Sequence, residues 1–437
     1  MLNSKAITKI QTILLISIIA IAFFSGIIYI FLNENLESVD PIKIGVLGDI
    51  DLMVGQSAFR GALLAAEQIN SEGGLLGRKI EIIGADSDSS NYDVAVATSA
   101  LNKLITLDKV DYIIASDGGI FLTPYQNIVS SHKKILFAVR SVLDSLTQNV
   151  LDNYDEYKYF FRVFYPNTTS SIDGLVDSIL TLREYTGFNK VGYLAEDFPS
   201  MNPVLEGFDT YLPQYDFELV YKGKCVPQTL DFSSYLAAIE DSGAEILFSF
   251  IPTEASISFV REWYDRQAPF VIWGNIALAQ DSEFWDITDE KCEHITTTGV
   301  PVTAGYPLTS KTLATRQAYI DRWGYVPDAF ATAAYDTVRF ILSEAIITAK
   351  TTETESVIKA LEKTDVETSM AKRFVFTSSH DVMVGEAGPN RLEENYMSVL
   401  MFQWQDGEMV PVYPKEIKEE SETSYTFPDW PGPWDDI

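Results

Sequence analysis

Histidine and cysteine, which build most metal sites and many nucleophilic sites, are scarce in this chain of 437 residues. The three histidines, His132, His294 and His380, lie far apart and show none of the close spacings of local metal motifs. Two cysteines exclude a four-thiolate zinc site. The sequence also contains no GxSxG elbow, HExxH, Walker loop or CxxC motif. It therefore predicts a protein that is not an enzyme and that carries no metal or cofactor.

Polar residues and glycines instead follow four predicted strands at their carboxyl ends. Open α/β sheets bind ligands at this edge. Two of the strand ends come from the first half of the chain and two from the second half, so a ligand held between two lobes would touch all four. The candidate ligand-binding residues are Asp117, Gly118, Gly119, Val139, Arg140, Ser141, Pro252, Thr253, Glu254, Asn275 and Ile276.

These residue types are suited to capturing a small carboxylate-bearing solute. The Arg140 guanidinium can hold a carboxylate through two hydrogen bonds, and the backbone N–H groups of Gly118 and Gly119 can approach the same ligand. Asp117 or Glu254 could meet an ammonium group if the solute is zwitterionic. The alternative is that Asp117 and Arg140 form a solvated surface ion pair, worth at most about 1 kcal/mol. The sequence leaves both interpretations open.

Short β-branched runs alternate with amphipathic stretches, which is typical of βαβ units in a parallel sheet. Two sets of strands predict an α/β protein with two doubly wound, Rossmann-like lobes. Helices are predicted at Ser57–Asn70, Leu175–Thr186 and Asp328–Lys350. The strands of the first set are Ile42–Leu47, Ile80–Gly84, Tyr112–Ala115 and Ile135–Ala138; those of the second are Val191–Ala195, Phe217–Tyr221, Ile246–Phe250 and Phe270–Trp273; late strands are Arg373–Phe376 and Ser398–Gln403.

The composition supports this organisation and excludes other classes of protein. Hydrophobic residues make up 46% and charged residues 22% of the chain, enough for a packed interior, and the length suits two domains. With 32 Lys+Arg against 62 Asp+Glu, the formal charge is −30. Such a surface repels nucleic-acid phosphates, so nucleic acid is not an expected partner.

The run from Ile13 to Leu32 contains no charged residue, and about 20 such residues cross a bilayer as one helix. Lysines precede the run and acids follow it, so the positive-inside rule keeps the N-terminus in the cytoplasm. We expect a cytoplasmic segment at 1–11, a single-pass membrane anchor at 12–32 and a linker at 33–41, with the globular part outside the cytoplasm. A cleaved signal peptide is the alternative.

Two further features depend on this location. Outside the cytoplasm a disulfide between Cys225 and Cys292 could persist, and two separate buried thiols are the other interpretation. Asn167-Thr168-Thr169 matches the triplet of a glycan acceptor, a pattern that is also common by chance.

Several segments together resemble the type I periplasmic binding proteins, in particular the branched-chain amino-acid (Leu/Ile/Val) and amide-binding family of ABC importers. The resemblance extends from Ile42 to about Pro414, and it is the combination of segments that is specific. The segments are Ile42–Leu47, Gly61 through Ala65, Ile69-Asn70 and Gly73-Gly74 to Gly77-Arg78, Tyr159–Arg162, Thr229–Ser234, Gly324–Pro327, Ala334–Asp336 and Phe402–Trp404 with Gly407.

The resemblance implies two lobes joined by a hinge that the chain crosses three times, near 162–165, 299–304 and 374–377. Lobe 1 would be 42–163 plus 303–376, and lobe 2 would be 164–302 plus 377–437. It implies capture of an amino-acid-like, amide or carboxylate solute by hinge closure, with ABC permease subunits as partners. A ligand-binding ectodomain of a sensory system, an extracellular hydrolase and an adhesive envelope protein are the alternatives.

Three positions depart from the amino-acid clamp of that family. Gly119 and Val142 stand where the family has hydroxyl residues, and Ile276 stands where it has an acid that meets the ligand ammonium. The resemblance therefore predicts the fold and the transport role, and it leaves the identity of the ligand open.

Overall fold

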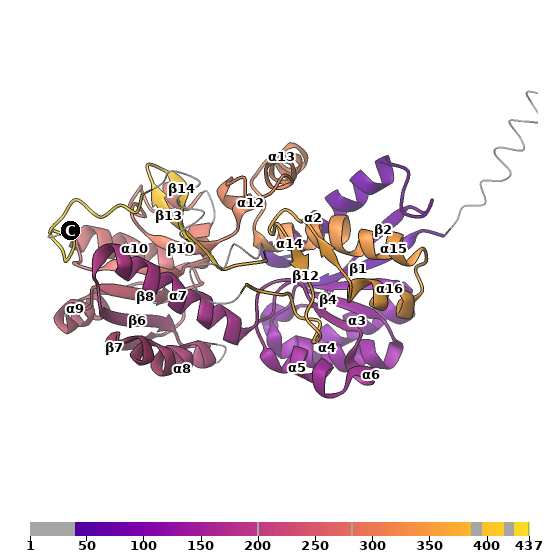
Figure 1. The fold of residues 1–437 in the computed structure, drawn as a ribbon, viewed down its shortest axis with the longest axis horizontal. Helices are drawn as coiled ribbons and strands as arrows, with labels where there is room; N and C mark the ends of the chain where they lie inside the picture. Colours follow the sequence, from indigo (N-terminus) through magenta and orange to yellow (C-terminus); the bar gives the residue numbers. More distant parts are fainter. Residues whose placement is uncertain (1–39, 199–200, 281–282, 386–395, 415–423, 436) are drawn as a thin grey trace, which may run out of the picture.

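A five-stranded parallel sheet organises the first part of the protein (Figure 1). The structure is a computed structural model, and it describes residues 40–198, 201–280, 283–385, 396–414, 424–435 and 437. The strand order β2-β1-β3-β4-β5 is that of a doubly wound sheet. These strands are almost entirely apolar because both faces of the sheet are covered. They are β1 (Ile42–Gly48), β2 (Ile80–Asp86), β3 (Tyr112–Ala115), β4 (Ile135–Ala138) and β5 (Phe160–Arg162).

A seven-stranded sheet organises the second part, in the order β14-β13-β10-β9-β8-β6-β7. The strands from β7 to β10 pair in parallel, whereas the hairpin of β13 and β14 joins the edge at β10 in antiparallel fashion. The strands are β6 (Lys190–Glu196), β7 (Glu218–Cys225), β8 (Ile246–Phe250), β9 (Val271–Asn275), β10 (Thr296–Gly299), β13 (Leu400–Gln405) and β14 (Glu408–Tyr413); β11 (Asp365–Val366) and β12 (Phe374–Val375) pair separately.

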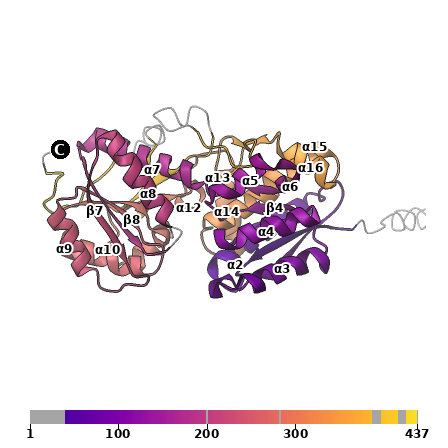
Figure 2. The same cartoon turned by 90° about the horizontal axis from the view of Figure 1, so that it is seen from below.

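Helices lie on both faces of the sheets; in the second part α7 and α8 lie on one face and α9 and α10 on the other (Figure 2). The α-helices are α2 (Met53–Ser71), α3 (Val94–Thr106), α4 (Gly119–His132), α5 (Asp144–Asp152), α6 (Tyr154–Tyr157), α7 (Thr168–Thr186), α8 (Asn202–Tyr211), α9 (Ser233–Ser242), α10 (Ala255–Arg266), α11 (Phe284–Ile287), α12 (Pro301–Ala304), α13 (Thr312–Trp323), α14 (Ala329–Asp336), α15 (Ser343–Ala349) and α16 (Thr354–Leu361).

Helix α14 packs closely along α2 although it comes late in the chain. A Cβ on Gly61 of α2 would lie 1.9 Å from the carbonyl oxygen of Ala331 in α14, so only glycine permits this approach. Helix α14 continues through a π-helical segment, η5 (Thr337–Leu342), into α15. The late helices therefore belong to the same layer as the N-terminal helices of the first sheet.

Two hydrophobic cores correspond to the two sheets, and we call the units around them the first lobe and the second lobe. The first core runs from Ile42 to Phe164 and resumes from Val300 to Met397, and the second runs from Ile172 to Ile295 and resumes at Met401. The chain thus passes between the cores three times. The third passage lies later than residues 374–377, because Val382 and Met397 still pack in the first core.

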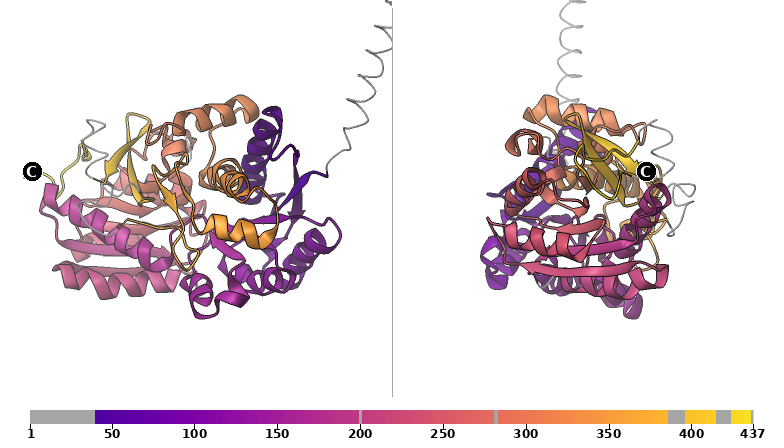
Figure 3. Two further views of the ribbon diagram at one scale, coloured as in Figure 1. Left: turned by 45° about the vertical axis from the view of Figure 1, so that its right-hand side comes forward. Right: turned by 90° about the vertical axis from the view of Figure 1, so that its left-hand side faces the viewer.

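The C-terminal residues lie against the second lobe (Figure 3). The Trp430 indole packs on Trp263 at 5.1 Å between ring centroids, and its Nε1–H donates to the Ala268 carbonyl at 3.0 Å. Six of the seven tryptophans belong to the second core or pack against it, whereas Trp323 packs against the first core. The two lobes therefore differ strongly in their content of tryptophan.

The structure confirms the predicted strands to within about two residues at their ends, except that β7 continues four residues past the predicted end, to Cys225. The helix expected at Asp328–Lys350 is present as α14, η5 and α15 in succession. The sequence analysis did not predict β10 or β14, and it identified the segment of β5 only through the family resemblance. These three strands are short or interrupted by proline, so their apolar pattern is weak.

The expected membrane anchor at 12–32 lies outside the described residues. Within the described ranges, no helix has both the length and the apolar character needed to cross a bilayer.

Candidate ligand-binding site

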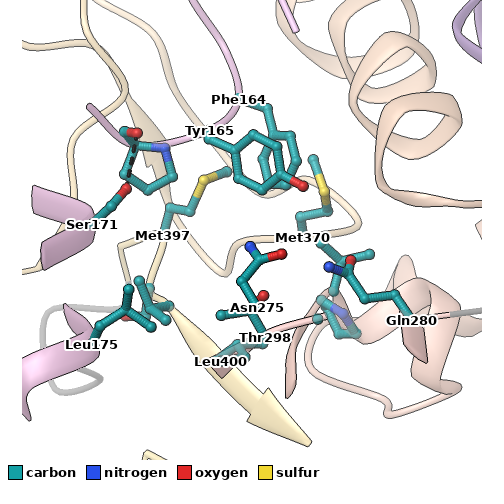
Figure 4. A pocket seen from close by; sticks show the side chains of 16 residues that line it. Phe164, Tyr165, Ser171, Leu175, Asn275, Gln280, Thr298, Met370, Met397 and Leu400 are labelled. Atoms are coloured by element: carbon teal, nitrogen blue, oxygen red, sulfur yellow. Dashed lines mark hydrogen bonds between the residues drawn. The ribbon is translucent and has the colours of Figure 1, made fainter. Parts of the chain in front are cut away.

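A pocket of about 660 Å³, including its open mouth, lies where the chain passes between the lobes (Figure 4). Its walls are mostly apolar, which is typical of small-molecule sites. Methionine side chains are flexible and adapt to the shape of a ligand, and two of them face this pocket. The labelled lining residues are Phe164, Tyr165, Ser171, Leu175, Asn275, Gln280, Thr298, Met370, Met397 and Leu400.

Polar groups gather at the side of the pocket that faces Tyr165. Figure 4 shows the Gln280 and Asn275 amides on the same side of the pocket as the Tyr165 hydroxyl. Burial raises the pKa of Tyr165 to about 12, with opposing effects of the Arg140 and Asp328 charges. The phenol is therefore neutral at physiological pH and available as a hydrogen-bonding group.

Arg140, directly after β4, lies near this polar side. Its guanidinium stands 5.6 Å from the ring centroid of Phe330, and that ring meets Tyr165 edge-on at 5.9 Å. The side chain is exposed, and among the described residues no carboxylate lies within ion-pair distance of it. Arg140 is thus a cation that is free to receive an anionic ligand beside an apolar pocket.

Asp117, directly after β3, has the opposite environment, and the solvated ion pair with Arg140 is wrong. Its carboxylate is buried and accepts hydrogen bonds from the Ser87 hydroxyl at 2.8 Å and the Tyr125 hydroxyl at 2.7 Å. Burial is the largest influence on this group and raises the pKa of Asp117, while the hydrogen bonds from Tyr125 and Ser87 act in the other direction. Asp117 therefore ties the loop after β2 to α4, and its oxygens are not open to a ligand ammonium.

Thr253 in the second lobe is similarly occupied. Its hydroxyl donates to Oε1 of the fully buried Glu196 at 2.6 Å, its backbone N–H donates to Oε2 at 3.2 Å, and the Gln228 N–H donates to Oε1 at 2.9 Å. Glu196, which the sequence analysis did not single out, thus joins three strand-end segments. Pro252 and Glu254 are exposed on either side of Thr253.

The other predicted residues serve the framework. Ile276 is buried and its N–H donates to the Thr297 hydroxyl at 3.1 Å. Gly118 precedes α4, and a Cβ on Gly119 would lie 2.7 Å from the Leu143 side chain, so a larger residue at 119 would displace Leu143. Val139 and Ser141 are buried beside Arg140. Of the eleven predicted residues, only Asn275 lines the pocket itself.

The sequence analysis missed most of the pocket wall, including Tyr165, Gln280, Met370 and Met397. Tyr165 and Met397 lie at passages between the lobes, whereas Met370 belongs to the first lobe and Gln280 to the second. The predicted crossings near 162–165 and 299–304 do indicate part of this wall. The strand ends carry the charged groups but little of the apolar surface of the pocket.

The structure contains Cys225 and Cys292 as two separate buried thiols, the second of the two interpretations offered above. Burial raises the pKa of Cys225 to about 11 and that of Cys292 to about 12. Neither thiol is therefore reactive at neutral pH.

Comparison with known proteins agrees with this fold. The chain matches the family model described as Periplasmic binding protein over residues 41–390. Leu/Ile/Val-binding protein homolog 7 of Brucella abortus (strain 2308) is 23% identical over 372 residues, which is 83% of this chain and 88% of the relative.

Two solved structures share the fold. The branched-chain amino acid transporter substrate binding protein LivJ from Streptococcus pneumoniae, in complex with isoleucine, has a TM-score of 0.67 at 20% identity, covering 86% of this chain and 100% of its own. A solute binding protein of an ABC transporter from R. palustris, in complex with benzoate, has a TM-score of 0.66 at 16% identity, covering 85% and 95%.

The match to the family model covers well over half of the chain, so this protein belongs to the periplasmic binding protein family. It has the type I α/β fold with parallel sheets. Binding proteins of this kind take up a small ligand and deliver it to the permease of an ABC transporter.

Proposed function

We propose that this chain is the substrate-binding protein of an ABC importer and captures a small carboxylate-bearing solute between its lobes. The observation that carries this proposal is the free Arg140 guanidinium beside an apolar interlobe pocket. A carboxylate would satisfy the guanidinium through two parallel hydrogen bonds, while the apolar body of the ligand would fill the pocket. Isoleucine and benzoate, bound by the two structural neighbours, both combine these features.

Recognition of an amino acid would also require a partner for the ammonium group. Asp117 is occupied by Ser87 and Tyr125, and Ile276 offers no charge. Glu254 is exposed and could fill this role from the second lobe. We therefore favour recognition mainly through the carboxylate and the apolar body, with amino acids as a narrower alternative.

Binding would act through closure of the lobes without a chemical step. A ligand that contacts both lobes stabilises the closed state only by its greater affinity for that state. The pocket lies at the passages between the lobes, so rotation about them would enclose the ligand. The closed form would then be recognised by the permease. The two solved structures reported above are described as binding proteins of transporters, so they give the sensory alternative no support.

A thermal-shift screen of the full-length chain tests this proposal. The panel pairs each acid with a neutral analogue: benzoate with benzamide, and isoleucine with isoleucinol. A micromolar ligand at millimolar concentration stabilises the folded state by about 4 kcal/mol. We expect a shift with at least one acid, none with its neutral partner, and loss of the shift in Arg140→Ala. Equal shifts with acid and analogue, or full affinity in Arg140→Ala, would refute carboxylate recognition by Arg140.

We further propose that residues 12–32 remain as a membrane anchor, so that the binder stays near its importer. The lobe boundaries 42–163 plus 303–376 and 164–302 plus 377–437 stay part of this proposal, with the third boundary moved toward 398 by the packing of Met397. The intact mass of the protein isolated from membranes tests the anchor. A mass near 48.9 kDa supports it, and a product that lacks the first residues contradicts it.

A further inference from the structure

The first turn of α7, in the second lobe, is hydrogen-bonded to the loop of the first lobe that carries Arg140. The backbone N–H and the hydroxyl of Thr168 both donate to the Val142 carbonyl, each at 2.7 Å. The Thr169 hydroxyl donates to the Asp144 carboxylate at 2.6 Å. The remainder of α7 packs in the second core. These three hydrogen bonds therefore connect the second lobe to the loop that follows β4.

A buried ion pair lies behind the same loop. Arg162 is fully buried at the end of β5, and its Nε is 2.9 Å from Oδ1 of Asp381. Its terminal nitrogens donate to the carbonyls of Ser141 at 2.7 Å and Leu143 at 2.6 Å. These carbonyls flank Val142, the residue that α7 contacts. The main chain next to Arg140 is thus held from both sides.

Asn167 joins the ion pair to the helix. Its Oδ1 accepts the Ser170 N–H at 2.8 Å, which caps α7, and its Nδ2 donates to Oδ2 of Asp381 at 3.0 Å. The Thr147 hydroxyl donates to the same Asp381 oxygen at 3.1 Å. The amide nitrogen to which a glycan would attach is therefore used in a contact between helix and ion pair. Asn167-Thr168-Thr169 is thus better explained as a structural motif.

We propose that Asn167, Thr168, Arg162 and Asp381 form an anchor, the α7 anchor, that fixes the Arg140 loop at the pivot between the lobes. They are positioning residues, because Thr168 and Arg162 bond the loop and Asn167 and Asp381 act through those two. The lobes would rotate about this anchored turn while Arg140 keeps its place beside Tyr165, so the cation is preorganised before closure. This inference rests on the proposed function in so far as Arg140 binds the ligand.

The variant Asn167→Asp tests the anchor and preserves the cap, since Asp caps helices as well as Asn does. It replaces the amide donor by a carboxylate that faces Asp381. We expect at least a 10-fold loss of affinity and a broader distribution of interlobe distances. Adding Asp381→Asn restores a donor–acceptor pair with the same total charge beside Arg162, and should recover both properties. Thr168→Val removes one hydroxyl and should cost about 2- to 10-fold in affinity.

Interlobe distances are measured by pulsed electron resonance in the full-length chain, with spin labels at Lys103→Cys in α3 and Lys222→Cys in β7. Both positions are exposed, and the two native thiols are buried and stay unlabelled. The control is Thr98→Val, whose hydroxyl bonds only within α3, to the Val94 and Ala95 carbonyls.

Benzoate and isoleucine are the probes for affinity. A wild-type distance distribution in both Asn167→Asp and Thr168→Val, or a double variant that recovers nothing, would overturn the α7 anchor. If neither probe binds the wild type, carboxylate capture loses its support, and the distance distributions of the ligand-free proteins still decide the anchor. If Asn167→Asp fails to fold, Thr168→Val against Thr98→Val gives the decision.

Discussion

The neighbouring strands β3 and β4 are each followed by a charged residue, and the two residues differ in charge and in surroundings. Asp117 is buried and its oxygens are occupied by Ser87 and Tyr125, whereas Arg140 is exposed and its guanidinium stands over the Phe330 ring. Both residues follow a buried strand and look equivalent in the sequence. A charged residue at a strand end is therefore a candidate ligand contact only while its hydrogen-bonding capacity remains unused.

The largest expected effect is the loss of stability when Asp117 is replaced. Asp117→Ala leaves the buried hydroxyls of Ser87 and Tyr125 without their acceptor, so we expect the free energy of unfolding to fall by about 2–4 kcal/mol. Urea denaturation at neutral pH measures it. Arg140→Ala is the matched control and should stay within about 0.5 kcal/mol of the wild type. Equal stability of the two variants would contradict the structural assignment of Asp117.

Replacement of Arg140 is expected to change ligand affinity instead of stability. Arg140→Ala should weaken binding of the carboxylate found in the screen by about 10- to 100-fold, because a charge-assisted pair of hydrogen bonds is lost. Arg140→Lys should restore only part of the affinity, since lysine cannot form the planar double contact. Calorimetric titration measures both variants. A lysine variant with wild-type affinity would show that charge alone is recognised.

Thr253 extends the comparison to the second lobe. Thr253→Val removes the hydroxyl that donates to Glu196, and we expect a loss of about 1–2 kcal/mol in unfolding free energy with unchanged ligand affinity. Thermal unfolding and titration of the same preparation measure the two quantities. A selective loss of affinity would return Thr253 to the ligand site, as the sequence analysis placed it.

The smallest effect concerns pH. Burial holds the folded-state pKa of Asp117 above the usual 3.8, so the stability that this group contributes is complete below about pH 4 and is lost as the pH rises through the folded-state pKa. The isosteric Asp117→Asn variant removes this titration. Stability curves from pH 3 to 7 should therefore show the wild type declining relative to Asp117→Asn as the pH rises, and the opposite trend would contradict the assigned cause.

The sequence predicted the sheets well and the site only in part. Continuous apolar runs identified β3, β4 and β8 to the residue, because strands covered on both faces need apolar side chains throughout. Arg140 was singled out from its place after a strand, and its contact with a ligand stays a prediction. The sequence could not show that Asp117 does not pair with Arg140. Asp117 is occupied by Ser87 and Tyr125, which lie on separate elements of the chain.

The residues of the pocket wall were harder to predict than the charged residues after the strands. Tyr165, Gln280 and Met397 come from widely separated segments that meet only at the passages between the lobes. Periodicity reports which face of an element is buried, but it does not report which segments meet. The predicted crossings gave the approximate place, and only the folded chain gives the neighbours.

The uneven distribution of tryptophan gives each lobe its own optical signature. Six of the seven indoles belong to the second lobe, so tryptophan fluorescence reports almost entirely on that half, while far-ultraviolet circular dichroism reports on the helices and strands of both halves. If the two cores unfold as independent units, the two signals will change at different denaturant concentrations. The unmodified protein can thus reveal how strongly its halves are coupled during unfolding.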